Sequence, residues 1–169
     1  MKPAHARTPI VEPPGSMRGL SLRQPWADAV VFGGKRIENR LKWTNSHFRG
    51  PFLIHASTGM TGREYEEVVG FVTERDLPWR PPPQHELAAR MGGIIGVATV
   101  VGVVRRGEDP RLAIALPESE KDVQYRWWMG MFALILSDVR PTPFVPCTGR
   151  LGFFRVPGEI VARALGKAA

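Results

Sequence analysis

The sequence contains one cysteine, and this excludes two classes of small protein. Cys147 has no second cysteine with which to form an internal disulfide, so the chain is not a disulfide-stabilised scaffold. The four histidines, His5, His47, His55 and His85, show no metal-ligand spacing. We therefore expect no metal and no cofactor, and we interpret Cys147 as a small packed thiol rather than a nucleophile.

Long apolar runs are also missing. No run approaches the roughly 20 residues that span a bilayer, and the N-terminus lacks the apolar core of a signal peptide. The sequence therefore predicts no membrane partner, and a reducing cytoplasm is the expected location.

Acidic residues are fewer than basic ones, 16 against 23, and the formal net charge is +7. Such an excess favours an anionic partner, with nucleic acid ahead of a membrane surface. The excess is concentrated between Met17 and Ser57, where Asp28 and Glu38 are outnumbered. The cations of this segment are Arg18, Arg23, Lys35, Arg36, Arg40, Lys42 and Arg49.

A length of 169 residues fits one domain with a sizeable core. Residues 1–16 are rich in proline and lack a periodic apolar pattern, so we expect a disordered leader followed by a single domain over 17–169. Within that domain, patterning predicts strands over 20–23, 51–57, 94–104, 131–136 and 148–156, and helices over 26–32, 61–75, 85–91 and 158–165. Pro141, Pro143 and Pro146 would confine any strand there to a sheet edge. Short strands with helices in the connections indicate an α+β fold, a small mixed β-barrel.

The segment from Gly33 to Arg40 is the most informative stretch. Its two glycines end a short helix, and the chain then becomes extended. Alternate residues of a strand share a face, so Glu38 and Arg40 should point the same way, with Lys35 beside them at the bend. A built pocket and an ordinary solvated salt-bridged edge both fit this spacing.

Two nearby residues each allow two interpretations. Trp26 is either a core anchor of the short helix or a surface on which a base stacks. His55 lies on the mixed face of the strand 51–57, where a buried, hydrogen-bonded structural role is favoured over a catalytic one.

Four motifs follow one another along the chain. They are Ser21-Leu22-Arg23-Gln24-Pro25-Trp26-Ala27, the signature Gly33-x-Lys35-x-x-Glu38-x-Arg40 with Trp43, the segment from Arg49 to Ser57, and the closing Gly149-Arg150-Leu151-Gly152-Phe153. In this order they resemble the ASCH domain, a family of the PUA-like superfamily. The resemblance implies a PUA-like barrel of five to six strands with a basic cleft lined by the signature residues. It implies RNA binding and, in some members, RNA-directed enzymology.

We therefore expect a module that binds RNA or a nucleotide, with single-stranded DNA as a further candidate, and we expect a monomer. Lys35, Arg36 and Arg40 would contact phosphates. Trp26, Trp43 or Trp128 would stack on unpaired bases. The candidate ligand-binding residues are Gln24, Trp26, Lys35, Glu38, Arg40, His55, Ser57 and Arg150.

The alternative is a hydrolase acting on RNA or a nucleoside, a ribonuclease or an acetylcytidine amidohydrolase, with Lys35, Glu38 and His55 as candidate catalytic residues. Some small ASCH proteins use a lysine and a threonine three residues later for amide hydrolysis. Here Glu38 stands at that position, so threonine chemistry does not carry over. Whether the chain is an enzyme stays open at this point.

Overall fold

The computed structural model describes residues 15–41, 47–113 and 115–166. All but the last two residues of the predicted leader, and also Trp43, lie outside these ranges. The strands are β1 (Met17–Leu22), β2 (Ile37–Arg40), β3 (Gly50–Ala56), β4 (Gly93–Val104), β5 (Phe132–Pro146) and β6 (Phe153–Val156). The α-helices are α1 (Trp26–Phe32), α2 (Gly62–Glu74), α3 (Gln84–Ala88), α4 (Lys121–Trp127) and α5 (Gly158–Leu165), with short 3₁₀ turns at Pro110–Leu112 and Glu118–Glu120.

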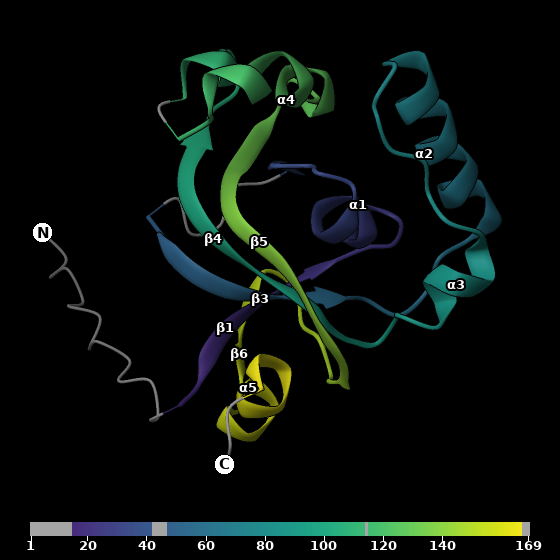
Figure 1. Cartoon of the computed structure of the whole chain (residues 1–169), viewed down its shortest axis with the longest axis vertical. Helices are drawn as coiled ribbons and strands as arrows, with labels where there is room; N and C mark the ends of the chain where they lie inside the picture. Colours follow the sequence, from purple (N-terminus) through teal and green to yellow (C-terminus); the bar gives the residue numbers. More distant parts are fainter. Residues whose placement is uncertain (1–14, 42–46, 114, 167–169) are drawn as a thin grey trace, which may run out of the picture.

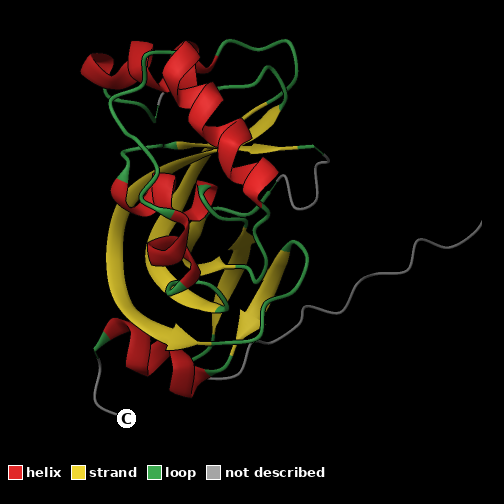
Figure 2. Ribbon diagram, turned by 90° about the vertical axis from the view of Figure 1, so that its right-hand side faces the viewer, coloured by secondary structure: helices red, strands yellow, loops and turns green. Residues whose placement is uncertain are grey.

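The six strands form one mixed sheet in the order β2-β5-β4-β3-β1-β6 (Figure 1). Neighbouring strands are antiparallel except for β1 and β3, which are parallel. The long strands β4 and β5 curve strongly, so that the sheet bends round on itself (Figure 2). Within the described residues no ladder joins β2 to β6, and the barrel is therefore open between these two edge strands. The α+β class and the mixed barrel of five to six strands expected from the sequence are confirmed, and the barrel has six strands among the described residues.

Helix α1 lies on the concave side of the curved strands (Figure 1). Its Val30 and Val31 are buried in a core cluster with Phe52 and Ile54 of β3. The intervening residue of β3, Leu53, points to a second cluster that α5 covers from the other side of the sheet. Strand β3 is therefore buried on both faces, which is why its sequence is a nearly continuous apolar run.

The helices α2 and α5 follow their sequence signals closely. Thr61 accepts a hydrogen bond from the main-chain N–H of Glu64, and the Glu64 carboxylate accepts one from the N–H of Thr61, a complete capping box at the start of α2. Helix α5 spans the predicted residues and ends at Gly166, whose φ is +65°. None of the described helices combines the length and apolarity needed to cross a membrane.

Strand β5 differs from the prediction. It continues from Phe132 through the three prolines to Pro146 as one strand paired with β4, with Pro141 opposite Gly96. Its second neighbour, β2, pairs only with Phe132 to Ile135, so the proline-bearing half does lie at an edge of the sheet, as expected. The predicted closing strand over 148–156 is shorter than expected, because β6 begins only at Phe153. Helix α4, within a stretch that the sequence analysis assigned to no element, was not predicted.

Two adjacent glycines end α1, each for its own reason. A Cβ atom on Gly33 would lie 2.7 Å from the main-chain oxygen of Ala29 and 2.7 Å from the ring of Trp79. Gly34 has a φ of +72°, the left-handed conformation that glycine adopts without strain. The first glycine permits close packing, and the second turns the chain toward β2.

The substitution Gly33→Ala should lower the free energy of unfolding by about 1–3 kcal/mol, because main-chain and ring atoms occupy the space of the new methyl group. Gly70 of α2 has no atom near the position of an added Cβ. Gly70→Ala should therefore raise the free energy of unfolding by about 0.5–1 kcal/mol. Urea denaturation of both variants measures the difference, and equal effects would contradict the close packing at Gly33.

Candidate functional site

The chain that follows the double glycine carries a buried ion pair. Lys35 is 1% exposed, and its Nζ donates to Oε2 of Glu38 at 2.7 Å. The other carboxylate oxygen of Glu38 lies 3.8 Å from Nη1 of Arg40. The ring of Trp26 covers the Lys35 ammonium group, with Nζ 5.7 Å from the ring centroid. The three charged side chains are together, as the alternation along the strand predicts.

The turn before β2 is held by a side chain from α4. Gln124 is 2% exposed; its Oε1 accepts from the N–H of Arg36 at 2.7 Å, and its Nε2 donates to the carbonyl of Gly34 at 2.8 Å. The guanidinium of Arg36 donates to the carbonyls of Val30 and Lys35. Burial lowers the pKa of Arg36 from its usual value. Arg36 therefore fixes the end of α1, and the phosphate contact expected for it stays a prediction.

A hollow of about 840 Å³ opens on the side of the barrel between β2 and β1, and we call it the β2 cleft. Strand β2 contributes Glu38 and Arg40 to its lining, and β1 contributes Ser21. Arg23 lies in the turn before α1, Trp26 is the first residue of α1, and Leu151 lies in the loop before β6. Trp26 packs edge-on against Phe71 of α2, with the ring centroids 5.3 Å apart. Trp26 is thus both a packing residue and part of the cleft wall.

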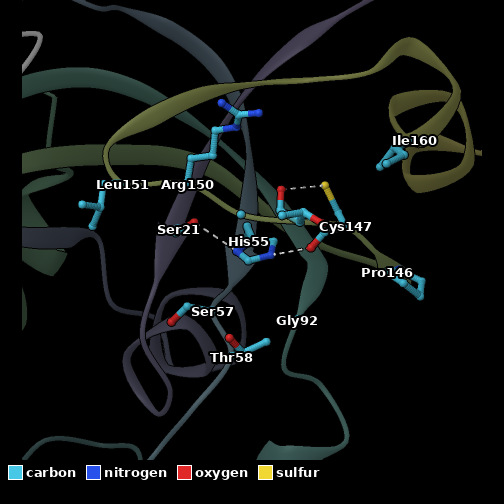
Figure 3. A pocket seen from close by; sticks show the side chains of 12 residues that line it. Ser21, His55, Ser57, Thr58, Gly92, Pro146, Cys147, Arg150, Leu151 and Ile160 are labelled. Atoms are coloured by element: carbon cyan, nitrogen blue, oxygen red, sulfur yellow. Dashed lines mark hydrogen bonds between the residues drawn. The ribbon is translucent and has the colours of Figure 1, made fainter.

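His55 links three separate parts of the chain. Its Nε2 lies 2.8 Å from the carbonyl oxygen of Cys147, and its Nδ1 lies 3.1 Å from Oγ of Ser21 (Figure 3). A carbonyl oxygen only accepts, so Nε2 carries the hydrogen; in the neutral ring Nδ1 then accepts from the Ser21 hydroxyl. Burial lowers the pKa of His55 below its ordinary 6.5. The ring is the buried, hydrogen-bonded structural histidine that the sequence analysis favoured.

A second hollow of about 760 Å³ lies over this histidine, and we call it the His55 hollow (Figure 3). Ser57 and Arg150 contribute to its lining, and the hydroxyl oxygen of Ser57 is buried without a hydrogen-bond partner among the described residues. Ser21 and Leu151 line both this hollow and the β2 cleft, so the two hollows are adjacent.

The predicted site residues therefore divide into three groups. Trp26, Glu38 and Arg40 line the β2 cleft, and His55, Ser57 and Arg150 line the His55 hollow. Lys35 and Gln24 are each 1% exposed and lie beneath the surface. Oε1 of Gln24 accepts from the N–H of Asp28 at 3.0 Å, inside the first turn of α1. Trp128 lines a separate hollow beside Arg75.

Sequence reasoning gave no site role to three residues that line these hollows. Ser21 was noted only as part of a motif, Arg23 as part of that motif and as one cation of the basic segment, and Leu151 was assigned to the closing strand. Leu151 is 100% exposed. An apolar residue within the Gly-Arg-Leu-Gly turn is the sequence feature that could have indicated its place at the site. Among the residues that the structure describes, no group of three or more His, Cys, Asp or Glu side chains could hold a metal ion.

Comparison with known families gives one match, in which the ASCH domain covers residues 20–138. The chain belongs to the ASCH domain family. ASCH domains are generally thought to bind RNA. The matched segment begins inside β1, contains β2, β3 and β4 and the Gly33–Arg40 signature, and ends inside β5. A search of curated proteins found no match.

Three solved structures resemble the fold. An ASCH protein from Zymomonas mobilis is 16% identical, with a TM-score of 0.48 over 88% of this chain and 93% of that one. A serine-to-alanine mutant of that protein is 17% identical, with a TM-score of 0.44 over 88% of this chain and 94% of the mutant chain. A tyrosine-to-phenylalanine mutant is also 17% identical, with a TM-score of 0.46 over 88% of this chain and 96% of the mutant chain. At this identity the likeness concerns the fold alone.

Because the His55 ring is buried, we expect the free energy of unfolding to fall at acidic pH. Its pKa is lowered in the folded state, so the unfolded chain binds the proton more readily. The contribution of His55 is therefore complete above about pH 6.5 and is lost as the pH falls below that value. Urea denaturation from about pH 8 to about pH 5 should show a steeper loss of stability for the wild type than for His55→Gln, which cannot titrate. Parallel pH profiles would contradict this role.

Proposed function

We propose that this ASCH domain binds single-stranded RNA, or a nucleotide, in the β2 cleft. The observation that supports this most directly is the composition of the cleft wall. Two arginines, an aromatic ring and a carboxylate surround one hollow of about 840 Å³ on a protein whose formal net charge is +7. That volume lies within the range of about 300–1,000 Å³ typical of ligand pockets.

Each wall residue has a chemistry suited to an unpaired nucleotide. Arg40, with a side chain 26% exposed, and Arg23, 55% exposed, can reach phosphate oxygens from the cleft rim. Trp26 offers a ring for stacking, and Glu38 can accept from the N–H groups of a base. Lys35 is too deeply buried to contact a ligand directly, so its role here is to hold the Glu38 carboxylate in place.

The hydrolase alternative has weaker support. Both ring nitrogens of His55 are already engaged, and the Lys35 ammonium group is paired within the protein, so neither presents a free base to the cleft. We therefore favour binding. Incubation with labelled RNA and with acetylated cytidine, beside Lys35→Ala, checks this choice; turnover that disappears in the variant would overturn it.

Affinity for single-stranded RNA should fall log-linearly with salt concentration, because phosphate contacts release counterions. Arg40→Ala should weaken binding and reduce the salt slope by about 0.7, the value for one lost contact to single-stranded nucleic acid. Arg105→Ala removes the same charge from an exposed position at the end of β4, paired with Glu108 at 3.7 Å. This control should leave the slope nearly unchanged. Fluorescence anisotropy at several salt concentrations measures both, and absence of binding at low salt would refute the proposal.

Glu38→Gln should leave the protein folded but less stable, because the buried Lys35 ammonium group loses its counter-charge. It should also weaken RNA binding about tenfold, because a neutral amide orients Lys35 and Arg40 less firmly than a carboxylate. Thermal unfolding and anisotropy on the same preparation separate the two effects. Unchanged affinity together with reduced stability would assign Glu38 a structural role only.

A further inference from the structure

The β2 cleft and the His55 hollow are separated by one exposed side chain. Leu151 lines both hollows and is 100% exposed, and Ser21 lies beneath the boundary between them. A ligand that covered the Leu151 side chain would remove its apolar surface from water, which is favourable. The two hollows, of about 840 and 760 Å³, lie on either side of one leucine. A ligand with two similar parts would fill both.

The loop that carries Leu151 is held firmly against the barrel. His55 binds the carbonyl of Cys147 at one end of it, as Figure 3 shows. Further along, a Cβ atom on Gly149 would collide with the His55 ring and lie 2.6 Å from Oγ of Ser21, so the main chain itself rests on these two side chains. Gly152 follows with a φ of +67° and turns the chain into β6. The main chain on both sides of Leu151 is therefore placed by packing and turn geometry, and the leucine side chain projects from it into solvent.

We propose that the two hollows bind two consecutive unpaired nucleotides of RNA, one base in each, with the side chain of Leu151 between the two bases. This inference rests on the proposed function of the β2 cleft and extends it to the neighbouring hollow. Apolar side chains such as leucine insert between base steps in other nucleic-acid complexes and replace the stacking that they interrupt.

The surroundings of Leu151 suit this arrangement. Arg150, the adjacent residue, is exposed at the His55 hollow, where it can contact the phosphate that joins the two nucleotides. In the β2 cleft, Trp26 supplies a stacking surface for the first base. An acidic or neutral peptide would leave the base-stacking surface and the phosphate-binding arginines without matching groups.

The test compares a ribonucleoside monophosphate, a dinucleotide and a trinucleotide at one low salt concentration. The step from one to two nucleotides should raise the affinity at least about tenfold, the gain from one further stacked base and its phosphate, and should exceed the step from two to three. Leu151→Ala should lower the affinity for the dinucleotide about fivefold, because the bases lose the apolar contact between them, and should lower the affinity for the monophosphate by less, because one base contacts only one side of the leucine. Leu112 is also exposed, at 79%, and does not line the His55 hollow or the β2 cleft, so Leu112→Ala is the matched control and should change neither affinity.

A dinucleotide of 2-aminopurine reports directly on the separation of the bases. Its long-wavelength couplet in circular dichroism exists only while the two bases stack on each other, and this couplet should disappear on binding to the wild type and to Leu112→Ala but not to Leu151→Ala. Equal affinity for one and two nucleotides, or binding with the couplet retained, would overturn the two-nucleotide arrangement while the β2 cleft proposal stands. Failure of every RNA to bind at low salt would remove both.

Discussion

Burial of the Lys35 ammonium group is the constraint on which the candidate site depends. A charge withdrawn from water is tolerated only with a close, well-oriented partner, and loss of such a partner typically costs about 3–5 kcal/mol. Glu38 is that partner, three residues along the chain and at a donor–acceptor distance of 2.7 Å. The need to satisfy this one amine fixes where β2 begins relative to α1, and it fixes the direction in which the Glu38 carboxylate faces the cleft.

Several parts of the fold could be predicted because their signals are local. The capping box of α2 needs only Thr61 and Glu64, and the strand β3 is a short apolar run between turn residues. Helix α4 could not be predicted, since its Gln124 and Trp127 are buried by contacts with segments far away in the sequence. The length of β5 was missed for a related reason: proline weakens a strand locally, but pairing with β4 along its whole length compensates.

The sequence predicted several residues of the candidate site but not how the site divides into two hollows. Alternation along β2 placed Glu38 and Arg40 correctly on one face, because that rule holds for any strand. Nothing in the sequence could separate one cleft into two adjacent hollows, since that depends on where the loop from Cys147 to Gly152 crosses the barrel. The position of the loop depends in turn on the ring of His55, whose two hydrogen bonds join residues 34 and 92 positions away.

The half of β5 that does not pair with β2 affects how readily the protein associates with other copies of itself. An uncovered edge strand presents free N–H and carbonyl groups to any extended segment that approaches. Such edges are starting points for aggregation. Pro141, Pro143 and Pro146 lack the N–H group, so this stretch of β5 has three positions that cannot donate to an incoming strand. The same prolines that obscure the strand in the sequence therefore protect the protein from intermolecular sheet extension.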